Sequence, residues 1–284
     1  MCSTMKTRLL IVLILFVTFS IHGCRSIFPR EKSKIVNPSG EPVPIGDLPG
    51  WKQIFYDDFT KDAPLGSWGS ECDASKIVYT GAQGQKWKSY PTCYKDTYQK
   101  RPYRADSVLS VKNGVLNFFL HPVGGQPAGA NPSPLVDGSS QYQLYGRYTA
   151  RFKVDNPTLK EYHVAWLLWP QTNKWPDDGE EDFPEGSLGG NITGFHHYAG
   201  EGACRGCQDK ASIPDENFTE WHTYTIEWRP GNVKYILDGK VVLDSDKWVP
   251  TKPMRWQLQT ETNGQGANKG NLLVDWVAVY KYAP

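Results

Sequence analysis

Residues 142–154 read YQLYGRYTARFKV, and their side chains alternate between two characters. The even positions are Tyr, Leu, Gly, Tyr, Ala, Phe and Val, whereas the odd positions are Gln, Tyr, Arg, Thr, Arg and Lys. Because successive side chains of a β-strand point to opposite faces, this period of two predicts a strand with one apolar face. The stretch therefore favours a protein built from half-buried β-sheets.

The same strand patterns recur along the chain. Residues 223–228 and 272–280 also alternate, and residues 164–169 are continuously apolar, which is typical of a buried strand. Asn113–Gly114 and Asp238–Gly239 lie between strand-like runs and predict tight hairpins. No stretch carries a convincing helical stripe. We expect an all-β fold, a two-sheet antiparallel β-sandwich.

Three segments divide the 284 residues. Residues 1–23 carry two basic residues, no acidic residue and an apolar run over 9–19, which predicts a secretory signal peptide. That run is shorter than the roughly 20 apolar residues of a transmembrane helix. Residues 24–50 are proline-rich and predict a linker or extended arm. Residues 51–284 are expected to form one domain, in which the long segments 81–106, 121–139 and 199–220 are loops beside a binding site.

The cysteines suit an exported protein. The leader ends at Cys24 in a weak lipobox, so the chain is expected to be secreted or lipid-anchored to the cell envelope at that residue. Four cysteines follow, and their even number predicts disulfides. Three pairings are open, of which Cys72–Cys93 with Cys204–Cys207 is the most local. Half of a zinc site at Cys204 and Cys207 is the alternative.

The overall composition excludes some partners. The formal net charge is only +1, which argues against nucleic acid or an anionic membrane surface as the partner. The chain has 11 Trp and 15 Tyr residues, which suit either a sugar-stacking surface or an aromatic β-core. We expect a monomer that binds a polysaccharide.

An acidic cluster occupies residues 175–186, which read WPDDGEEDFPEG. In a regular strand Glu180 and Asp182 share one face, and Glu185 points to the other. One β-bulge between Asp182 and Glu185 returns Glu185 to the first face, and Pro184 supports it because prolines within sheets occur at edges and bulges. The spacing therefore predicts three carboxyl groups in a row.

Three neighbouring carboxyl groups repel one another, so at least one is expected to keep its proton at neutral pH. Glycosidic cleavage needs such a pair, because one carboxylate attacks the anomeric carbon and one carboxylic acid protonates the leaving oxygen. A carboxyl separation of about 5–5.5 Å goes with retention of configuration, and one of about 6.5–9.5 Å goes with inversion.

Residues 179–186, GEEDFPEG, resemble the catalytic strand of glycoside hydrolase family 16 in its bulged, laminarinase-like form. Four further segments resemble other strands of the family in the family's order: 51–59, 145–154, 221–228 and 274–280. The resemblance implies a concanavalin A-like jelly roll with a cleft on its concave face, and catalysis with retention. The reaction that the resemblance implies needs no cofactor.

The resemblance also implies roles for the acidic residues. Glu180 would be the nucleophile, Glu185 the general acid/base, and Asp182 the residue between them that tunes the nucleophile. Position 181 is usually apolar in the family, whereas here it is Glu181. A second register would use Glu181 and Glu185 and would place Phe183 in the middle. We prefer the first register because it keeps all three acids, and under it Glu181 needs a buried partner or a raised pKa.

Several other side chains are candidates for substrate binding. Trp175 precedes the motif where the family stacks a sugar, and Trp166 is a second stacking candidate, although either could pack in the core. His196 and His197 are adjacent on the next strand, so only one of them can face the cleft. The run 256–262 carries two polar candidates on one face, Gln259 and Glu261, which would bond sugar hydroxyls or form an exposed polar strand face.

The resemblance implies a structural calcium ion on the convex side. Its ligands would be Asp58, Asp275 and the backbone carbonyl near Gly114, and oxygen ligands suit calcium. The alternative is that these are ordinary surface or turn residues.

Taken together, the sequence predicts an exported endo-β-glycanase that cleaves β-1,3-glucan. The same machinery acting on mixed-linkage glucan or a galactan is one alternative. A lectin-like sandwich without catalysis is the alternative from another class, and it would have no need of three clustered carboxyl groups.

Overall fold

The computed structural model describes residues 37–200 and 202–284, and these form one compact unit. The predicted signal peptide 1–23, the lipidation site Cys24 and the first part of the proline-rich segment lie outside the described residues. Within the described residues the secondary structure is β-strand apart from one four-residue helix. Among them, no helix is long and apolar enough to cross a membrane.

The elements follow in chain order. They are β1 (Trp51–Asp57), β2 (Tyr79–Thr80), β3 (Lys86–Ser89), α1 (Ala105–Val108), β4 (Leu109–Lys112), β5 (Val115–Val123), β6 (Gln126–Ala128), β7 (Pro132–Pro134), β8 (Tyr142–Gln143), β9 (Gly146–Val154), β10 (Tyr162–Pro170), β11 (Glu180–Ser187), β12 (Asn191–His197), β13 (Gln208–Asn217), β14 (His222–Arg229), β15 (Asn232–Leu237), β16 (Lys240–Ser245), β17 (Met254–Thr262) and β18 (Gly270–Tyr282).

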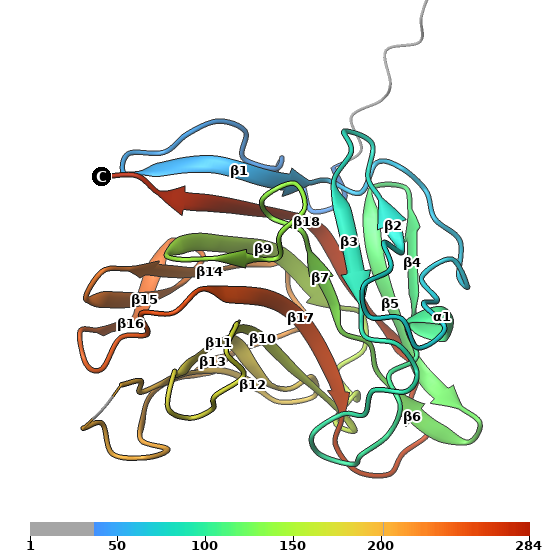
Figure 1. Cartoon of the computed structure of the whole chain (residues 1–284). Coiled ribbons are helices and arrows are strands. Elements are labelled where there is room, and N and C mark those ends of the chain that lie inside the picture. The colour runs from blue at the N-terminus through green and yellow to red at the C-terminus, as the bar shows by residue number, and fades with distance from the viewer. Residues whose placement is uncertain (1–36, 201) are drawn as a thin grey trace, which may run out of the picture. The chain divides into compact units, whose positions relative to one another are not determined.

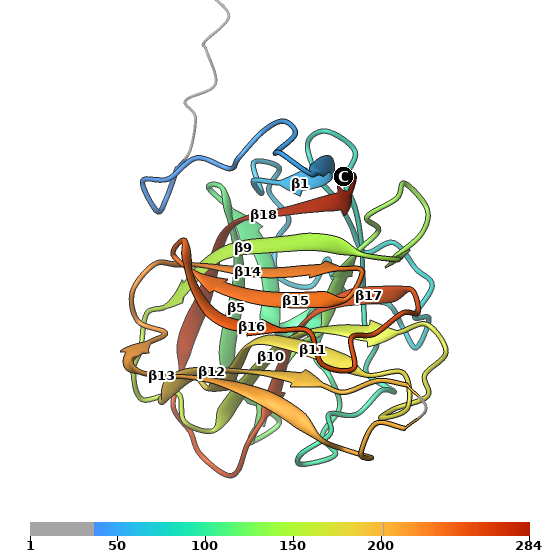
Figure 2. The same cartoon turned by 90° about the vertical axis from the view of Figure 1, so that its left-hand side faces the viewer.

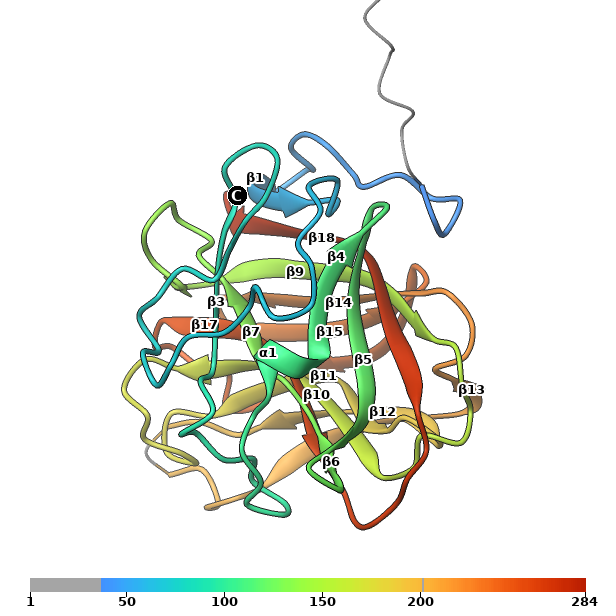
Figure 3. The ribbon, with the colours of Figure 1, turned by 90° about the vertical axis from the view of Figure 1, so that its right-hand side faces the viewer.

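Two large antiparallel sheets form the sandwich that the sequence predicts. One has the order β16-β15-β14-β9-β18-β5-β4, with β1 on β18 and β6 on β5, and the other has the order β13-β12-β11-β10-β17-β8 (Figures 1 and 2). A small sheet, β2-β3-β7, lies at one side, and α1 lies beside β4 and β5 (Figure 3). Strands adjacent in space are often distant in sequence, as in a jelly roll.

Aromatic side chains join the inner faces of the two large sheets. The rings of Phe152 on β9 and Trp166 on β10 lie 4.3 Å apart between centroids. Phe183 on β11 stacks on Tyr235 of β15 at 5.0 Å. Such pairs add attraction to the burial of large apolar surfaces, so this layer holds the sheets together.

Most predicted strands and turns are confirmed. Asn113–Gly114 joins β4 to β5, and Asp238–Gly239 joins β15 to β16. Residues 142–154 form β8 and β9 with a break between them at Leu144–Tyr145. On β9 the predicted apolar positions, including Phe152, face the core. The prediction of three long loops is wrong in part, because each segment contains strands. β3 lies in the segment 81–106, β6 and β7 lie in 121–139, and residues 208–217 of the segment 199–220 form β13.

The alternation predicted for residues 272–280 fails in the middle of β18. A bulge between Val274 and Trp276 shifts the register. Before it Leu272 and Val274 enter the core, whereas after it Val277 and Val279 do so. Trp276 and every second residue after it therefore point to the outer face of the sheet. The extra residue at the bulge moves each side chain that follows it to the other face.

Residues 37–50 lie against this outer face as an extended segment. Ser39 donates its backbone N–H to Asp275 Oδ2 at 3.0 Å, and Trp276 donates its indole N–H to the carbonyl of Glu41 at 2.9 Å. Arg151 donates to Ser39 Oγ at 2.7 Å and pairs with the carboxylate of Glu41 at 3.3 Å. Side chains of β9 and β18 thus fasten the arm to the sheet.

The calcium site implied by the family resemblance would lie on this sheet. Asp275 is buried, and burial together with the nearby charge of Asp58 raises the pKa of its carboxyl, against the hydrogen bond from Ser39. Gly114 lies at the β4–β5 turn. Two carboxyl groups that repel each other and a backbone carbonyl are ligands of the kind that a divalent cation takes. The calcium ion stays a prediction.

The most local disulfide pairing is present. Cys72 is bonded to Cys93, and Cys204 is bonded to Cys207. The thiolates that a zinc site would need are therefore engaged in a disulfide, and the alternative of a zinc site at Cys204 and Cys207 is wrong.

The predicted bulge in the acidic strand is confirmed, and Gly194 allows the neighbouring strand to pass over it. The register of β11 against β12 shifts between Asp182 and Glu185, and the register against β10 shifts at the same place. A Cβ atom at Gly194 would lie 2.7 Å from Phe183 Cδ2 and 2.9 Å from the carbonyl oxygen of Asp182. Only a residue without a side chain fits there.

We expect Gly194→Ala to lower the free energy of unfolding by about 1–3 kcal/mol, because the added methyl group overpacks the bulge. Gly69→Ala is the control, since its Cβ would meet ordinary contacts at 3.6 and 3.7 Å, and it should change stability by less than about 0.5 kcal/mol. Denaturant unfolding of the three proteins measures both values. Equal stability of Gly194→Ala and wild type would show that the strand can move away from the bulge.

Candidate active site

A cavity of about 430 Å³ lies over the six-stranded sheet. Its floor consists of alternate residues from β10, β11, β12 and β17, and the segment 90–103 forms one wall. The lining residues are Tyr90, Lys95, Thr97, Tyr98, Tyr103, Ala165, Leu167, Trp169, Trp175, Glu180, Asp182, Glu185, His197, Gln257, Gln259 and Glu261. The predicted acids therefore share one cavity.

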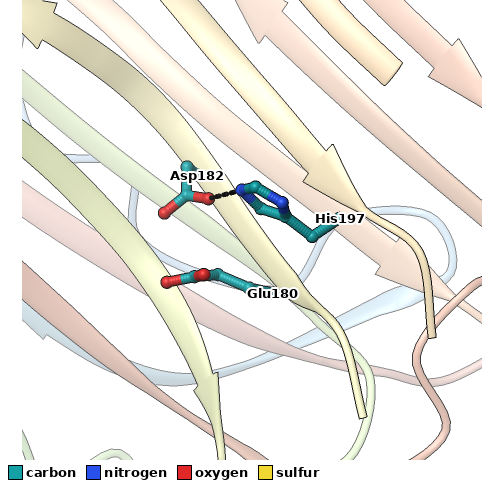
Figure 4. A group of neighbouring side chains, drawn as sticks. All are labelled: Glu180, Asp182 and His197. Carbon is teal, nitrogen blue, oxygen red and sulfur yellow. Dashed lines mark ion pairs between the residues drawn. The ribbon is translucent and has the colours of Figure 1, made fainter. Parts of the chain in front are cut away.

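The three carboxyl groups of β11 line this cavity together. Glu180 and Asp182 are buried, and Glu185 is half-buried. Across the strand pair, Asp182 Oδ2 lies 3.2 Å from Nε2 of His197, which comes from β12 (Figure 4). The bulge places Glu185 on the same face as the other two acids, as the spacing predicts.

Burial makes the two inner carboxyls hard to ionise. Burial and then the charge of Asp182 raise the pKa of Glu180 well above its usual range, while His197 acts in the opposite direction. Burial and then the charges of Glu185 and Glu181 raise the pKa of Asp182. The row of acids therefore holds at least one proton near neutral pH, as acid–base chemistry requires.

Glu181 points away from the cavity into the core, so the second register, with Glu181 as a catalytic residue, is wrong. Its Oε1 lies 2.9 Å from Nδ1 of His196, and its Oε2 accepts a hydrogen bond from the hydroxyl of Tyr235 at 2.8 Å. His196 is fully buried and also bonds the carbonyl of Lys247 through Nε2 at 2.7 Å. These contacts supply the buried partner that Glu181 needs.

His196 is therefore not a substrate-binding residue, and His197 is the histidine that faces the cavity. The reason is the strand geometry, because adjacent side chains of β12 point to opposite faces. Trp175 is 44% exposed, lines the cavity and lies 5.9 Å from the ring of His197. Its place fits an aromatic platform beside the acids.

Trp166 cannot contact a substrate, which corrects the prediction of a stacking role. It is fully buried between the sheets, against Phe152 and Phe118. The β10 residues that line the cavity are the odd ones, Ala165, Leu167 and Trp169. The continuous apolar run hid this division because both faces of β10 are apolar.

Gln259 and Glu261 line the cavity, but they also hold its wall. Glu261 Oε1 accepts the backbone N–H of Thr97 at 2.8 Å, and its Oε2 accepts the hydroxyl of Thr97 at 2.7 Å. The hydroxyl of Tyr103 lies 2.9 Å from Glu261 Oε1 and 3.1 Å from Gln259 Oε1. The predicted exposed strand face is wrong, since both residues are buried under this wall.

Sequence reasoning missed His163, which contacts the predicted acid/base. Its Nε2 lies 3.0 Å from Glu185 Oε1, and the ring of Tyr98 lies 4.9 Å from its own ring. His163 lies on β10, directly across from Glu261 on β17. Its alternation with Ala165 and Leu167, which line the cavity, is the signal that would have placed it on the same face of β10.

One group of three side chains among the described residues has ligand atoms close enough to hold a metal ion. It consists of Glu180, Asp182 and His197, with ligand atoms within 4.8 Å of one another (Figure 4). The same group contains two of the three carboxyls that glycosidic cleavage needs.

A model of glycosyl hydrolases family 16 matches residues 109–278. Probable glycosidase CRR1 of Saccharomyces cerevisiae is 35% identical over 156 residues, which are 49% of this chain and 35% of the yeast protein. The matched part thus spans about a third of that relative.

Solved structures share the fold at low identity. The laminarinase from Rhodothermus marinus superposes with a TM-score of 0.58 and 21% identity over 82% of this chain and 98% of its own. The endo-β-1,3-glucanase from Pyrococcus furiosus has a TM-score of 0.58 and 18% identity over 86% and 99%. These likenesses support the jelly-roll sandwich.

The buried contact between Glu181 and His196 generates a stability prediction. We expect Glu181→Ile alone to lower the free energy of unfolding by about 3–5 kcal/mol, because it leaves the His196 imidazole buried without its charge partner. The double variant Glu181→Ile/His196→Phe should recover most of that loss, since apolar side chains can replace a buried pair. Denaturant unfolding measures both, and a double variant no more stable than the single one would contradict the pairing.

The same pair sets a dependence of stability on pH. Burial lowers the pKa of His196, but the charge of Glu181 and the hydrogen bonds to Glu181 and Lys247 outweigh it and raise the pKa to about 9. A group with a raised folded-state pKa stabilises the protein fully below its unfolded value of about 6.5 and loses that contribution up to its folded value. The contribution of His196 should therefore be lost between about pH 6.5 and 9, so the fall of stability over this range should be smaller in the double variant than in the wild type.

Proposed function

Since the chain belongs to glycosyl hydrolases family 16, we propose that it is an endo-β-glycanase that cleaves β-1,3-glucan with retention of configuration. The observation that carries the proposal is the row of Glu180, Asp182 and Glu185 in one cavity. The names of two similar solved structures, a laminarinase and an endo-β-1,3-glucanase, support β-1,3-glucan as the substrate.

In the proposed two-step displacement each acid has a task. Glu180, as the carboxylate, attacks the anomeric carbon, and Glu185, as the carboxylic acid, protonates the departing oxygen. The proton held by the row of acids must therefore lie on Glu185 when the glycosidic bond breaks. The glycosyl-enzyme ester then reacts with water, from which Glu185 removes a proton. Asp182 lies between them and, with His197 at 3.2 Å, balances the charge that moves along the row.

The second enzymatic candidate is the same reaction on a mixed-linkage glucan or a galactan. A third candidate is a lectin-like sandwich without catalysis. The cost of burying Glu180 and Asp182 speaks against a pure binder, because sugar hydroxyls can be bound by groups that are cheaper to desolvate.

We extend the proposal to the setting of the enzyme. The leader predicted at 1–23 and the two disulfides, Cys72–Cys93 and Cys204–Cys207, fit a protein exported to an oxidising compartment. Lipidation at Cys24 would tether it to the cell envelope. The proposed enzyme acts as a monomer, needs no cofactor for the reaction and carries a structural calcium ion.

Glu180→Gln and Glu185→Gln should each lower kcat on laminarin by at least about 100-fold, because each removes a group that reacts or transfers a proton. Glu220→Gln, at an exposed position, is the matched control and should stay within about twofold of wild type. Reducing ends released from a panel of β-glucans and galactans provide the measurement. Normal turnover by both variants would refute the assignment.

His163→Phe should lower kcat by about 10- to 100-fold with little change in KM, because it frees the Glu185 carboxyl from its hydrogen-bond partner without removing a sugar contact. His163→Gln keeps an N–H donor and should recover part of that rate. Initial rates on laminarin over a range of concentrations separate kcat from KM. Equal kcat values for wild type and His163→Phe would show that Glu185 needs no positioning by His163.

A further inference from the structure

A second cavity, of about 310 Å³, adjoins the catalytic cavity, and the two share Tyr90 and Gln257 in their walls. Its lining includes Lys88, Tyr90, Tyr142, Asn173, Arg255 and Gln257. None of the described residues that line it is acidic, whereas Lys88 and Arg255 are cationic. The charge of this cavity is therefore opposite to that of its neighbour.

Arg255 is the central feature of the cationic cavity. It is only 8% exposed. Its guanidinium donates to Tyr90 Oη at 2.9 Å, to Tyr142 Oη at 3.2 Å and to Asn173 Oδ1 at 3.4 Å. All three partners are neutral, and within the described part of the chain Arg255 forms no salt bridge with a carboxylate. Among the described residues no carboxylate therefore lies within salt-bridge distance of this buried positive charge.

A buried guanidinium stays charged in a protein, so it needs compensation from an anion. Arginine has five N–H donors in a fixed fork, and three hydrogen bonds leave donors available. Tyr90 and Tyr142 accept from Arg255, which leaves their own hydroxyl hydrogens to donate elsewhere. The cavity therefore offers a planar fork and two hydroxyl donors, which match a group with several negatively charged oxygens.

The position of this cavity fixes which sugar could carry such a group. Leu167 on β10 pairs with Asp182 on one side and with Gln257 on the other. Two strand spacings, roughly 10 Å, therefore separate the catalytic row from Gln257. The acidic residues of the catalytic cavity outnumber its one lysine, Lys95, so an anionic group is better accommodated beyond Gln257.

We propose that the cavity around Arg255 and Lys88 is a subsite for an oxyanion, a sulfate ester or a carboxylate, on a sugar next to the one that is cleaved. The proposal rests on the proposed function and narrows its substrate class to polysaccharides that carry anionic substituents. Neutral chains still fit the catalytic cavity, but they leave the charge of Arg255 uncompensated.

The experiment compares kcat/KM on laminarin with kcat/KM on the same laminarin after partial O-sulfation or carboxymethylation. The ratio of anionic to neutral substrate should exceed one for the wild type and should fall about 10- to 100-fold in Arg255→Met, because a charged, buried hydrogen-bond pair is lost. Arg255→Lys should retain part of the ratio, since it keeps the charge and loses the fork. Lys88→Met should lower it less. Lys112→Met, an exposed position on the nine-stranded sheet, is the charge-matched control and should not change it.

The outcomes separate the proposals. A wild-type ratio below one, or an equal ratio in wild type and Arg255→Met, overturns the anionic subsite while leaving the glycanase intact. If Arg255→Met fails to fold, Arg255→Lys and Lys88→Met decide in the same way.

If no polysaccharide is cleaved, the proposed function fails. Calorimetric titration with sulfated and neutral laminarin oligosaccharides then still tests the subsite. A larger ratio with the sulfated or the carboxymethylated substrate identifies which oxyanion the fork prefers.

Discussion

The β-bulge between Asp182 and Glu185 is the constraint on which the site depends. Without it Glu185 would point into the core, and the cavity would contain only two of the three acids of the strand. The extra residue is accommodated because Gly194 on β12 leaves room for the ring of Phe183 and for the carbonyl of Asp182. Phe183 in turn stacks on Tyr235, so the bulge is fixed from the core side as well as from the neighbouring strand.

Glu181 shows what accompanies a row of acids on a buried strand. Its carboxylate faces two donors, and both nitrogens of His196 face acceptors, which favours the doubly protonated imidazole. Tyr235 offers one hydrogen to two acceptors, Glu181 Oε2 at 2.8 Å and the carbonyl of Phe195 at 2.6 Å. The network compensates the charge of Glu181 in the core, although that charge still contributes to the raised pKa of Asp182. The floor of the active site is therefore electrostatically coupled to the packing beneath it.

The parts of the molecule that sequence could predict are those governed by local spacing. The period of two located β9 and β14, the turn dipeptides located two hairpins, and the spacing of the acids with Pro184 located the bulge in β11. The bulge in β18 carries no such mark, so the facing of Trp276 was missed. Trp166 was misplaced, and the choice between His196 and His197 stayed open, because a strand that is apolar or polar on both faces does not reveal which face is inward. His163 and Arg255 matter through partners that are far away in sequence, and no local pattern reports such contacts.

Strand β17 connects these observations, because one face of it crosses both cavities. Its outward row runs through Arg255, Gln257, Gln259 and Glu261, so its side chains change from cation to amides to anion within seven residues. Glu261 accepts hydrogen bonds from Thr97 and Tyr103 of the wall segment, whereas the hydrogen-bond partners of Arg255 among the described residues are all neutral. A rigid strand cannot rearrange to neutralise one end with the other, since their side chains are about 20 Å apart along it. Arg255 is therefore the end of the strand at which an anionic ligand gains the most binding free energy.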